Sequence, residues 1–128
     1  MTTYNMQLTQ DRLKKEGIQN VKFISVTFDP NRDFPSVLKK YAEIRNIGFK
    51  DWTFLWGDKK NTNSFMDRFD ITFFPADTTY SPDGGVSYSM MHTDRISLID
   101  SDGELRKNYR GSRVNMDELF NDIKYLGD

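Results

Sequence analysis

A largely apolar stretch near the N-terminus constrains the fold more than any other feature of the sequence. Residues 21–28 read VKFISVTF, and the polar run Asp-Pro-Asn-Arg-Asp follows at residues 29–33. A short run that is apolar at almost every position, and rich in β-branched and aromatic side chains, is typical of a strand buried on both faces. We therefore predict a buried strand at residues 21–28 that leads directly into a loop.

The segments around this strand alternate between helical and strand patterns. Helices are predicted at residues 6–16 and at 34–45, the second with Pro35 in its first turn and an apolar stripe at helical spacing. The sequence WTFLW at residues 52–56 predicts a short strand, and a third helix is expected near residues 62–69. The order helix, strand, helix, strand, helix favours a parallel sheet with helical crossovers.

The second half of the chain has clear turn-forming sequences. Residues 78–87 (TTYSPDGGVS) are expected to form a loop, because Pro, Gly and Asp favour turns. Residues 95–100 and 105–109 predict a β-hairpin in which Gly103 takes a positive φ. An amphipathic closing helix is predicted at residues 115–126, with Asn115 as its cap.

Length and charge limit the class of protein. The chain has 128 residues, enough for one domain, with 18 basic and 19 acidic side chains scattered along it. A nucleic-acid-binding surface needs clustered cations, so the charge pattern argues against a nucleic-acid partner. No apolar run is long enough to span a bilayer or to act as a signal peptide. We expect a single soluble globular domain over residues 1–128.

The chain contains no cysteine. It can therefore form no disulfide, no thiolate nucleophile, no zinc finger and no iron–sulfur cluster.

The single histidine, His92, is the one side chain expected to titrate near neutral pH or to bind a soft metal through imidazole. A lone histidine is more often structural, but His92 lies between a Gly-rich loop and a predicted strand, where sites are often built. The neighbouring Met90 and Met91 could supply thioether ligands for Cu(I), although apolar packing is the favoured interpretation.

Carboxylates occur at two further positions of interest. Asp29 and Asp33 follow the carboxyl end of the predicted buried strand, the functional edge of many α/β sheets, but they could equally cap the loop. Asp100 and Asp102 flank the predicted hairpin turn and are most simply turn formers.

Three segments together resemble the Sco/SenC family. Residues 26–33 (VTFDPNRD) with Pro35 are similar to the family's S-V-D-P-x-x-D-x-P pattern, and residues 51–57 (DWTFLWG) are similar to W-x-F-L-T-G. Residues 81–103 contain a Pro-Asp-Gly-Gly loop, then His-Thr-Asp, then ISLIDSDG, much like H-x-x-x-x-Y-L-I-D-x-D-G. The order and spacing of these motifs cover nearly the whole chain.

This resemblance implies a thioredoxin-like α/β fold, a three-layer sandwich with helices on both faces of a mixed sheet. It also implies a role in copper delivery to the Cu(A) centre of cytochrome c oxidase subunit II, rather than enzymatic catalysis. Family members bind copper through two cysteines of a C-x-x-x-C-P motif and one histidine, and they are extracytoplasmic and membrane-tethered. His92 matches the family's histidine ligand, and Asp29 matches an acidic residue near the metal.

The sequence departs from the family pattern at its N-terminus. Residues 3–6 (TYNM) resemble the T-x-N-M that opens the helix after the second cysteine. We therefore expect an N-terminally incomplete domain that lacks both cysteines and the central strand before them. Such a chain is expected to rearrange, to form a homodimer by strand exchange or to be marginally stable, because buried strand edges need partners. It should bind copper weakly or not at all.

Two other functions stay open. A longer parent protein with a C-x-x-C motif upstream would be a thiol–disulfide redox protein of thioredoxin type. A relative without any cysteine would serve as a partner-docking module.

Overall fold

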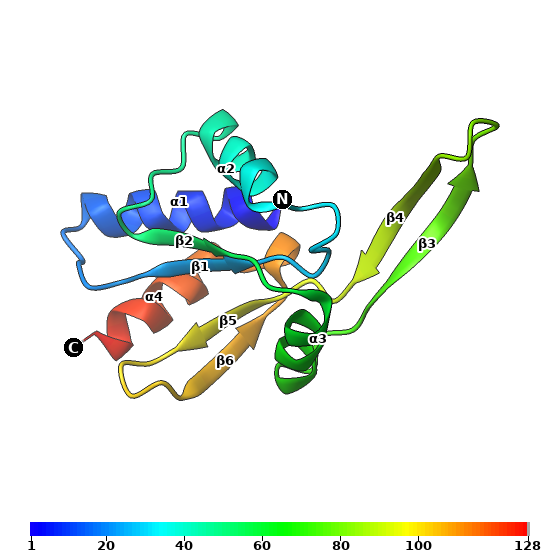
Figure 1. Ribbon diagram of the computed structural model, residues 1–128. Helices are drawn as coiled ribbons and strands as arrows, with labels where there is room; N and C mark the ends of the chain where they lie inside the picture. The colour runs from blue at the N-terminus through cyan, green and yellow to red at the C-terminus, as the bar shows by residue number, and fades with distance from the viewer. Residues whose placement is uncertain (128) are drawn as a thin grey trace. The chain divides into compact units, whose positions relative to one another are not determined.

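The computed structural model describes residues 1–127. Its chain separates into two compact units, one formed by Met1–Lys22 with the segment from Asp94 onward, the other by Phe23–Thr93. Helices and strands alternate from α1 to β3, and β4, β5 and β6 then follow before η1 and α4, so the predicted α/β class is confirmed (Figure 1). The strands described form three two-stranded sheets, β1 with β2, β3 with β4 and β5 with β6. The expectation of a single domain over residues 1–128 stays a prediction.

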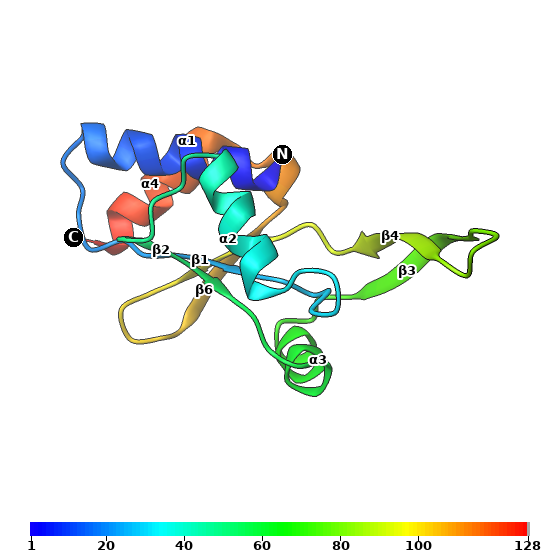
Figure 2. The same cartoon turned by 45° about the horizontal axis from the view of Figure 1, so that its top comes forward.

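The first unit joins the two ends of the chain. It contains α1 (Thr2–Lys15), β5 (Ile96–Ile99), β6 (Leu105–Tyr109), the short 3-10 helix η1 (Gly111–Arg113) and α4 (Met116–Leu126). Helix α1 packs against α4 and η1 (Figure 2). Its core consists of apolar side chains from both helices and β6, namely Leu13, Tyr109, Leu119, Phe120 and Ile123. Full burial of one such side chain contributes about 1.5–3 kcal/mol.

The local predictions for this unit are confirmed. Strands β5 and β6 form an antiparallel hairpin, and Gly103 in its turn has a φ of +81°. Asp100 shapes the same turn, because its Oδ1 accepts hydrogen bonds from the backbone N–H groups of Asp102 and Glu104. Asn115 caps α4 by accepting a hydrogen bond from the backbone N–H of Glu118.

The second unit begins with the predicted crossover. Strand β1 (Phe23–Val26) pairs in parallel with β2 (Trp52–Leu55), and α2 (Pro35–Ile44) connects them. Helix α3 (Lys59–Arg68) follows β2. The core of this sheet is Trp52, which is fully buried against the ring of Phe23 at 5.1 Å between centroids. The indole N–H of Trp52 donates to Ser25 Oγ at 2.9 Å, so its polar atom is also satisfied.

The predicted burial of this region was partly wrong. The strand at residues 21–28 was expected to be buried on both faces, but Ile24 is 55% exposed. In α2 the buried residue is Ala42, whereas Val37 and Ile44 of the predicted apolar stripe are exposed. The physical reason is the size of the sheet, because two strands of four residues offer too little surface to cover both the strand and its crossover helix.

The predicted loop at residues 78–87 was also wrong. Strand β3 (Phe73–Tyr80) runs through its first half, and β4 (Val86–His92) begins before its end. The two strands form an antiparallel ribbon that extends away from the β1–β2 sheet of the same unit (Figure 1). The Pro, Gly and Asp residues of this segment lie within the five-residue turn at 81–85. The Thr, Tyr and Val residues on either side of the turn favour strands.

Neither β1 nor β5 has a second partner strand among residues 1–127. The expected loss of a central strand and the expected strand exchange stay predictions. None of the helices described is long and apolar enough to span a membrane.

Candidate metal site

His92 is the last residue of β4, and not part of a loop-to-strand junction as the sequence predicted. Its exposed imidazole packs against the ring of Phe28, with 4.6 Å between centroids. The Nδ1 atom lies 3.1 Å from the carbonyl oxygen of Thr93. Because a carbonyl oxygen only accepts hydrogen bonds, Nδ1 is the donor in this contact, and in the neutral imidazole the lone pair is then on Nε2. This arrangement is typical of histidines that bind metals through Nε2.

Asp29 lies in a different environment. It is 7% exposed, and its Oδ2 accepts a hydrogen bond from Arg32 Nε at 2.7 Å. The hydroxyl of Tyr88 donates to the same carboxylate, at 3.1 Å from Oδ1 and 3.3 Å from Oδ2. We call Asp29, Arg32 and Tyr88 the Asp29 cluster. It fastens the loop that follows β1 to the middle of β4.

Arg32 completes the Asp29 cluster. Its Nη1 donates to the backbone oxygen of Tyr88 at 2.7 Å, and its guanidinium lies 4.2 Å from the centre of the Tyr88 ring. Burial, followed by the hydrogen bond to Asp29, raises the pKa of Tyr88. Tyr88 therefore remains a hydrogen-bond donor at neutral pH. Because its carboxylate oxygens already accept hydrogen bonds from Arg32 and Tyr88, Asp29 acts in this structure as an anchor for β4.

Asp33, the second carboxylate predicted at this edge, is a loop-capping residue. Its Oδ2 accepts a hydrogen bond from Thr27 Oγ1 at 2.7 Å, and its backbone N–H donates to the carbonyl of Asp29 at 2.9 Å. The alternative that the sequence left open, loop capping, is therefore what the structure shows for Asp33.

The donor atoms present do not make a three-ligand copper site. Within residues 1–127 there is no group of three or more His, Cys, Asp or Glu side chains that could hold a metal ion. The whole chain lacks cysteine. Nε2 of His92 is thus the strong nitrogen donor of this region, and a single imidazole leaves most of the coordination sphere of an ion to water.

Sequence analysis missed Tyr88 and Arg32 as part of the site. Tyr88 is 59 positions away from Asp29 along the chain. No local pattern links two residues at that distance. The spacing of Arg32 three residues after Asp29 was the only available sign of an ion pair.

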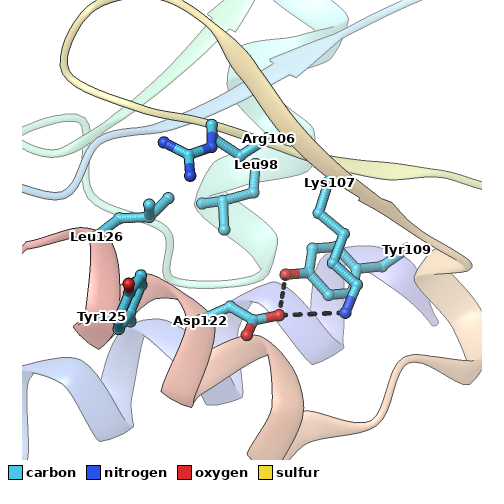
Figure 3. Close-up of a pocket in the computed structure, with 7 residues that line it drawn as sticks. All are labelled: Leu98, Arg106, Lys107, Tyr109, Asp122, Tyr125 and Leu126. Carbon is cyan, nitrogen blue, oxygen red and sulfur yellow. Dashed lines mark hydrogen bonds and ion pairs between the residues drawn. The ribbon is translucent and has the colours of Figure 1, made fainter.

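A cavity of about 150 Å³ lies between the β5–β6 hairpin and α4 (Figure 3). The hydroxyl of Tyr109 donates to Asp122 at 2.6 Å, and Lys107 forms ion pairs with Asp122 at 3.4 Å and with Glu118. The Tyr109 hydrogen bond is the largest cause of a lowered Asp122 pKa, and Lys107 adds to it. These groups satisfy one another and fasten β6 to α4, so we assign the cavity a structural role.

Comparison with known proteins identifies the family. The sequence pattern of SCO1/SenC proteins matches residues 1–127. The chain belongs to the SCO1/SenC family. The SCO1 protein homolog of Bacillus subtilis is 32% identical over 123 residues, which cover 95% of this chain and 60% of that protein. This SCO1/SenC chain therefore spans about three-fifths of the length of that relative.

Solved SCO1/SenC structures share the fold. A SCO1/SenC family lipoprotein from Bacillus anthracis superposes with a TM-score of 0.79 at 26% identity, covering 99% of this chain and 71% of that one. ScoI of Bradyrhizobium japonicum, solved with copper bound, has a TM-score of 0.72 at 22% identity and covers 97% of this chain and 74% of that one. The thioredoxin-like α/β fold of the Sco family is confirmed for this chain.

Proposed function

We propose that this chain is the copper-handling part of a protein that delivers copper to the Cu(A) centre of cytochrome c oxidase subunit II. The proposal depends on the position of His92 at the end of β4. Its Nδ1 is hydrogen-bonded to the Thr93 carbonyl, which leaves Nε2 to bind a metal. Membership of the SCO1/SenC family and the copper bound in the Bradyrhizobium relative support it. In this function, copper is the ion that the protein carries and transfers.

The 128 residues on their own bind copper weakly. Tight binding of Cu(I) in proteins relies on soft thiolate ligands, and the chain has none. The Asp29 carboxylate does not compensate, because Arg32 and Tyr88 already occupy it. Asp29 therefore acts on copper indirectly, by holding the strand that ends at His92.

The site of action is extracytoplasmic and close to a membrane. The Bacillus anthracis relative is described as a lipoprotein, which supports a tether in this family. Subunit II of the oxidase is the proposed partner, and no catalytic step is assigned to any residue of this chain.

A second candidate function is that of a partner-docking module without metal. The β3–β4 ribbon favours it, because large apolar side chains of both strands are exposed: Phe74, Tyr80, Val86 and Met91. A thiol–disulfide exchange activity has no comparable support, since a thiolate would have to come from outside these 128 residues.

Copper titration distinguishes these functions. The chain and a cysteine-containing member of the family are titrated with Cu(I) and Cu(II) in competition with chelators of known affinity. We expect binding that is more than about a hundredfold weaker than in the relative and is lost in His92→Ala. Affinity equal to that of the relative, or affinity unchanged in His92→Ala, would overturn the proposal. A complete absence of copper binding would favour the docking module.

A further inference from the structure

The register of the β3–β4 ribbon separates its two adjacent methionines. The backbone N–H of Thr93 donates to the carbonyl of Thr72 at 2.8 Å, and the pairs Phe73↔His92, Phe74↔Met91 and Pro75↔Met90 follow without interruption. The irregularity in the ribbon lies further along, between Ala76 and Thr79. Because side chains alternate along a strand, Met90 shares a face with His92, and Met91 lies on the opposite face.

The spacing of Met90 and His92 suits a single small ion. Two residues apart in a strand, their Cα atoms are separated by about 6.6 Å. Both side chains are long enough to converge from there, and the unbranched methionine has three rotatable bonds with which to adjust. An ion between them can therefore contact the thioether Sδ and the imidazole Nε2 together.

The face of the ribbon that carries His92 and Met90 also suits a soft cation. The Phe28 ring and the Thr93 carbonyl hold the imidazole in place and leave Nε2 as its donor atom. Phe28 packs in turn against Phe73, at 5.8 Å between centroids, so the base of this face is aromatic. A thioether donor favours singly charged Cu(I) over Cu(II) and Zn²⁺.

We propose that Met90 and His92 form a weak Cu(I) site with one sulfur and one nitrogen ligand on this face of the ribbon. The inference rests on the proposed function for the identity of the metal, and it goes beyond that function in assigning Met90 as a ligand. In a chain without cysteine, a methionine thioether is the only kind of sulfur that can serve. The exposed Met91, on the opposite face, takes no part.

The two methionines provide a matched pair of variants. Cu(I) affinity is measured without oxygen, by competition with a chromophoric chelator, for the wild-type chain, Met90→Leu, Met91→Leu and His92→Ala. Leucine nearly conserves the volume of methionine, and circular dichroism and thermal melts verify that each variant keeps the wild-type fold. We expect Met90→Leu to weaken Cu(I) binding at least about tenfold. Met91→Leu should bind like the wild type, and Cu(II) affinity should be the same in all but His92→Ala.

X-ray absorption at the copper edge supplies a second readout. The wild type and Met91→Leu should each have one sulfur neighbour at copper, which Met90→Leu should lack. If Met90→Leu keeps the wild-type affinity and spectrum while His92→Ala loses Cu(I), the methionine assignment is overturned and the proposed function stands. If His92→Ala also keeps wild-type Cu(I) affinity, both are overturned.

Discussion

The hydroxyl of Tyr88 lies 3.1 Å from Oδ1 of Asp29 and joins the loop after β1 to the middle of β4. Arg32 bonds to both residues and closes the cluster. His92 is the last residue of the same strand. The position of the candidate metal ligand therefore depends on a contact between two residues that are 59 positions apart in the sequence.

Removing this hydroxyl should loosen the strand. In Tyr88→Phe the ring still packs on Arg32, but the Asp29 carboxylate loses one of its two donors. We expect the melting temperature to fall by a few degrees and Cu(I) binding to weaken, because hydrogen bonds to charged groups are the stronger ones. Tyr80→Phe is the control, since Tyr80 is 76% exposed in the same ribbon. Equal melting temperatures and copper affinities for the two variants would show that the Asp29 contact does not position β4.

The unit that contains α1 and α4 should become less stable at acid pH, because Asp122 is protonated there. Its pKa is lowered by the Tyr109 hydrogen bond and by Lys107. A carboxyl with a depressed folded-state pKa contributes stability above its unfolded pKa of about 4, and the contribution is lost as pH falls through the lower folded value. Asp122→Asn should thus unfold at lower denaturant than the wild type at pH 7, and the difference should shrink at pH 3.

Denaturant titrations at both pH values measure this dependence. Asp11→Asn, which removes an exposed carboxyl of α1, is the control and should leave the difference between pH 7 and pH 3 as in the wild type. A gap between Asp122→Asn and the wild type that is the same at both pH values would contradict the assignment to Asp122 ionisation.

Gly111 should tolerate no side chain. A Cβ there would lie 2.7 Å from Thr2 Oγ1 and 2.8 Å from Asp94 Oδ1, two atoms that are hydrogen-bonded to each other. Gly111→Ala should therefore destabilise the contact between α1 and η1 by about 1–3 kcal/mol, measured by chemical denaturation. Gly48→Ala meets no atom within 4 Å and should change stability little. Similar stabilities for the two variants would mean that Thr2 moves aside at no cost.

Local chemistry made much of this structure predictable. Asn115 and Gly103 each act through neighbours within a few residues, so a cap and a turn could be predicted from the sequence. The β3–β4 ribbon was not predicted, because the five turn-forming residues at its tip made the whole segment look like a loop despite the strand-forming residues on either side. Exposure of Ile24 and the Tyr88–Asp29 contact depend on tertiary structure, which no short pattern encodes.

The unpaired edges of β1 and β5 predict that the chain does not form a stable monomer in solution. Among the residues described, β1 pairs only with β2 and β5 only with β6. Edge strands without partners favour pairing with another chain. We expect this chain to form oligomers or to melt with low cooperativity, and light scattering coupled to size exclusion measures the first. A stable monomer of 15.0 kDa with a sharp melt would contradict this expectation.

The central proposal is that His92 occupies the place of the copper-binding histidine of SCO1/SenC proteins, in a chain that has their fold but no cysteine. A chimera tests it most directly, with the cysteine-bearing N-terminal segment of a family member fused ahead of Met1. The control fusion carries both cysteines changed to serine, which separates completion of the fold from supply of the ligands. The measurement is the Cu(I) dissociation constant of each protein. We predict more than about a hundredfold tighter binding in the cysteine chimera than in the serine control, and loss of that gain in His92→Ala. Equal dissociation constants for the two fusions, or a gain that His92→Ala leaves intact, would contradict the account.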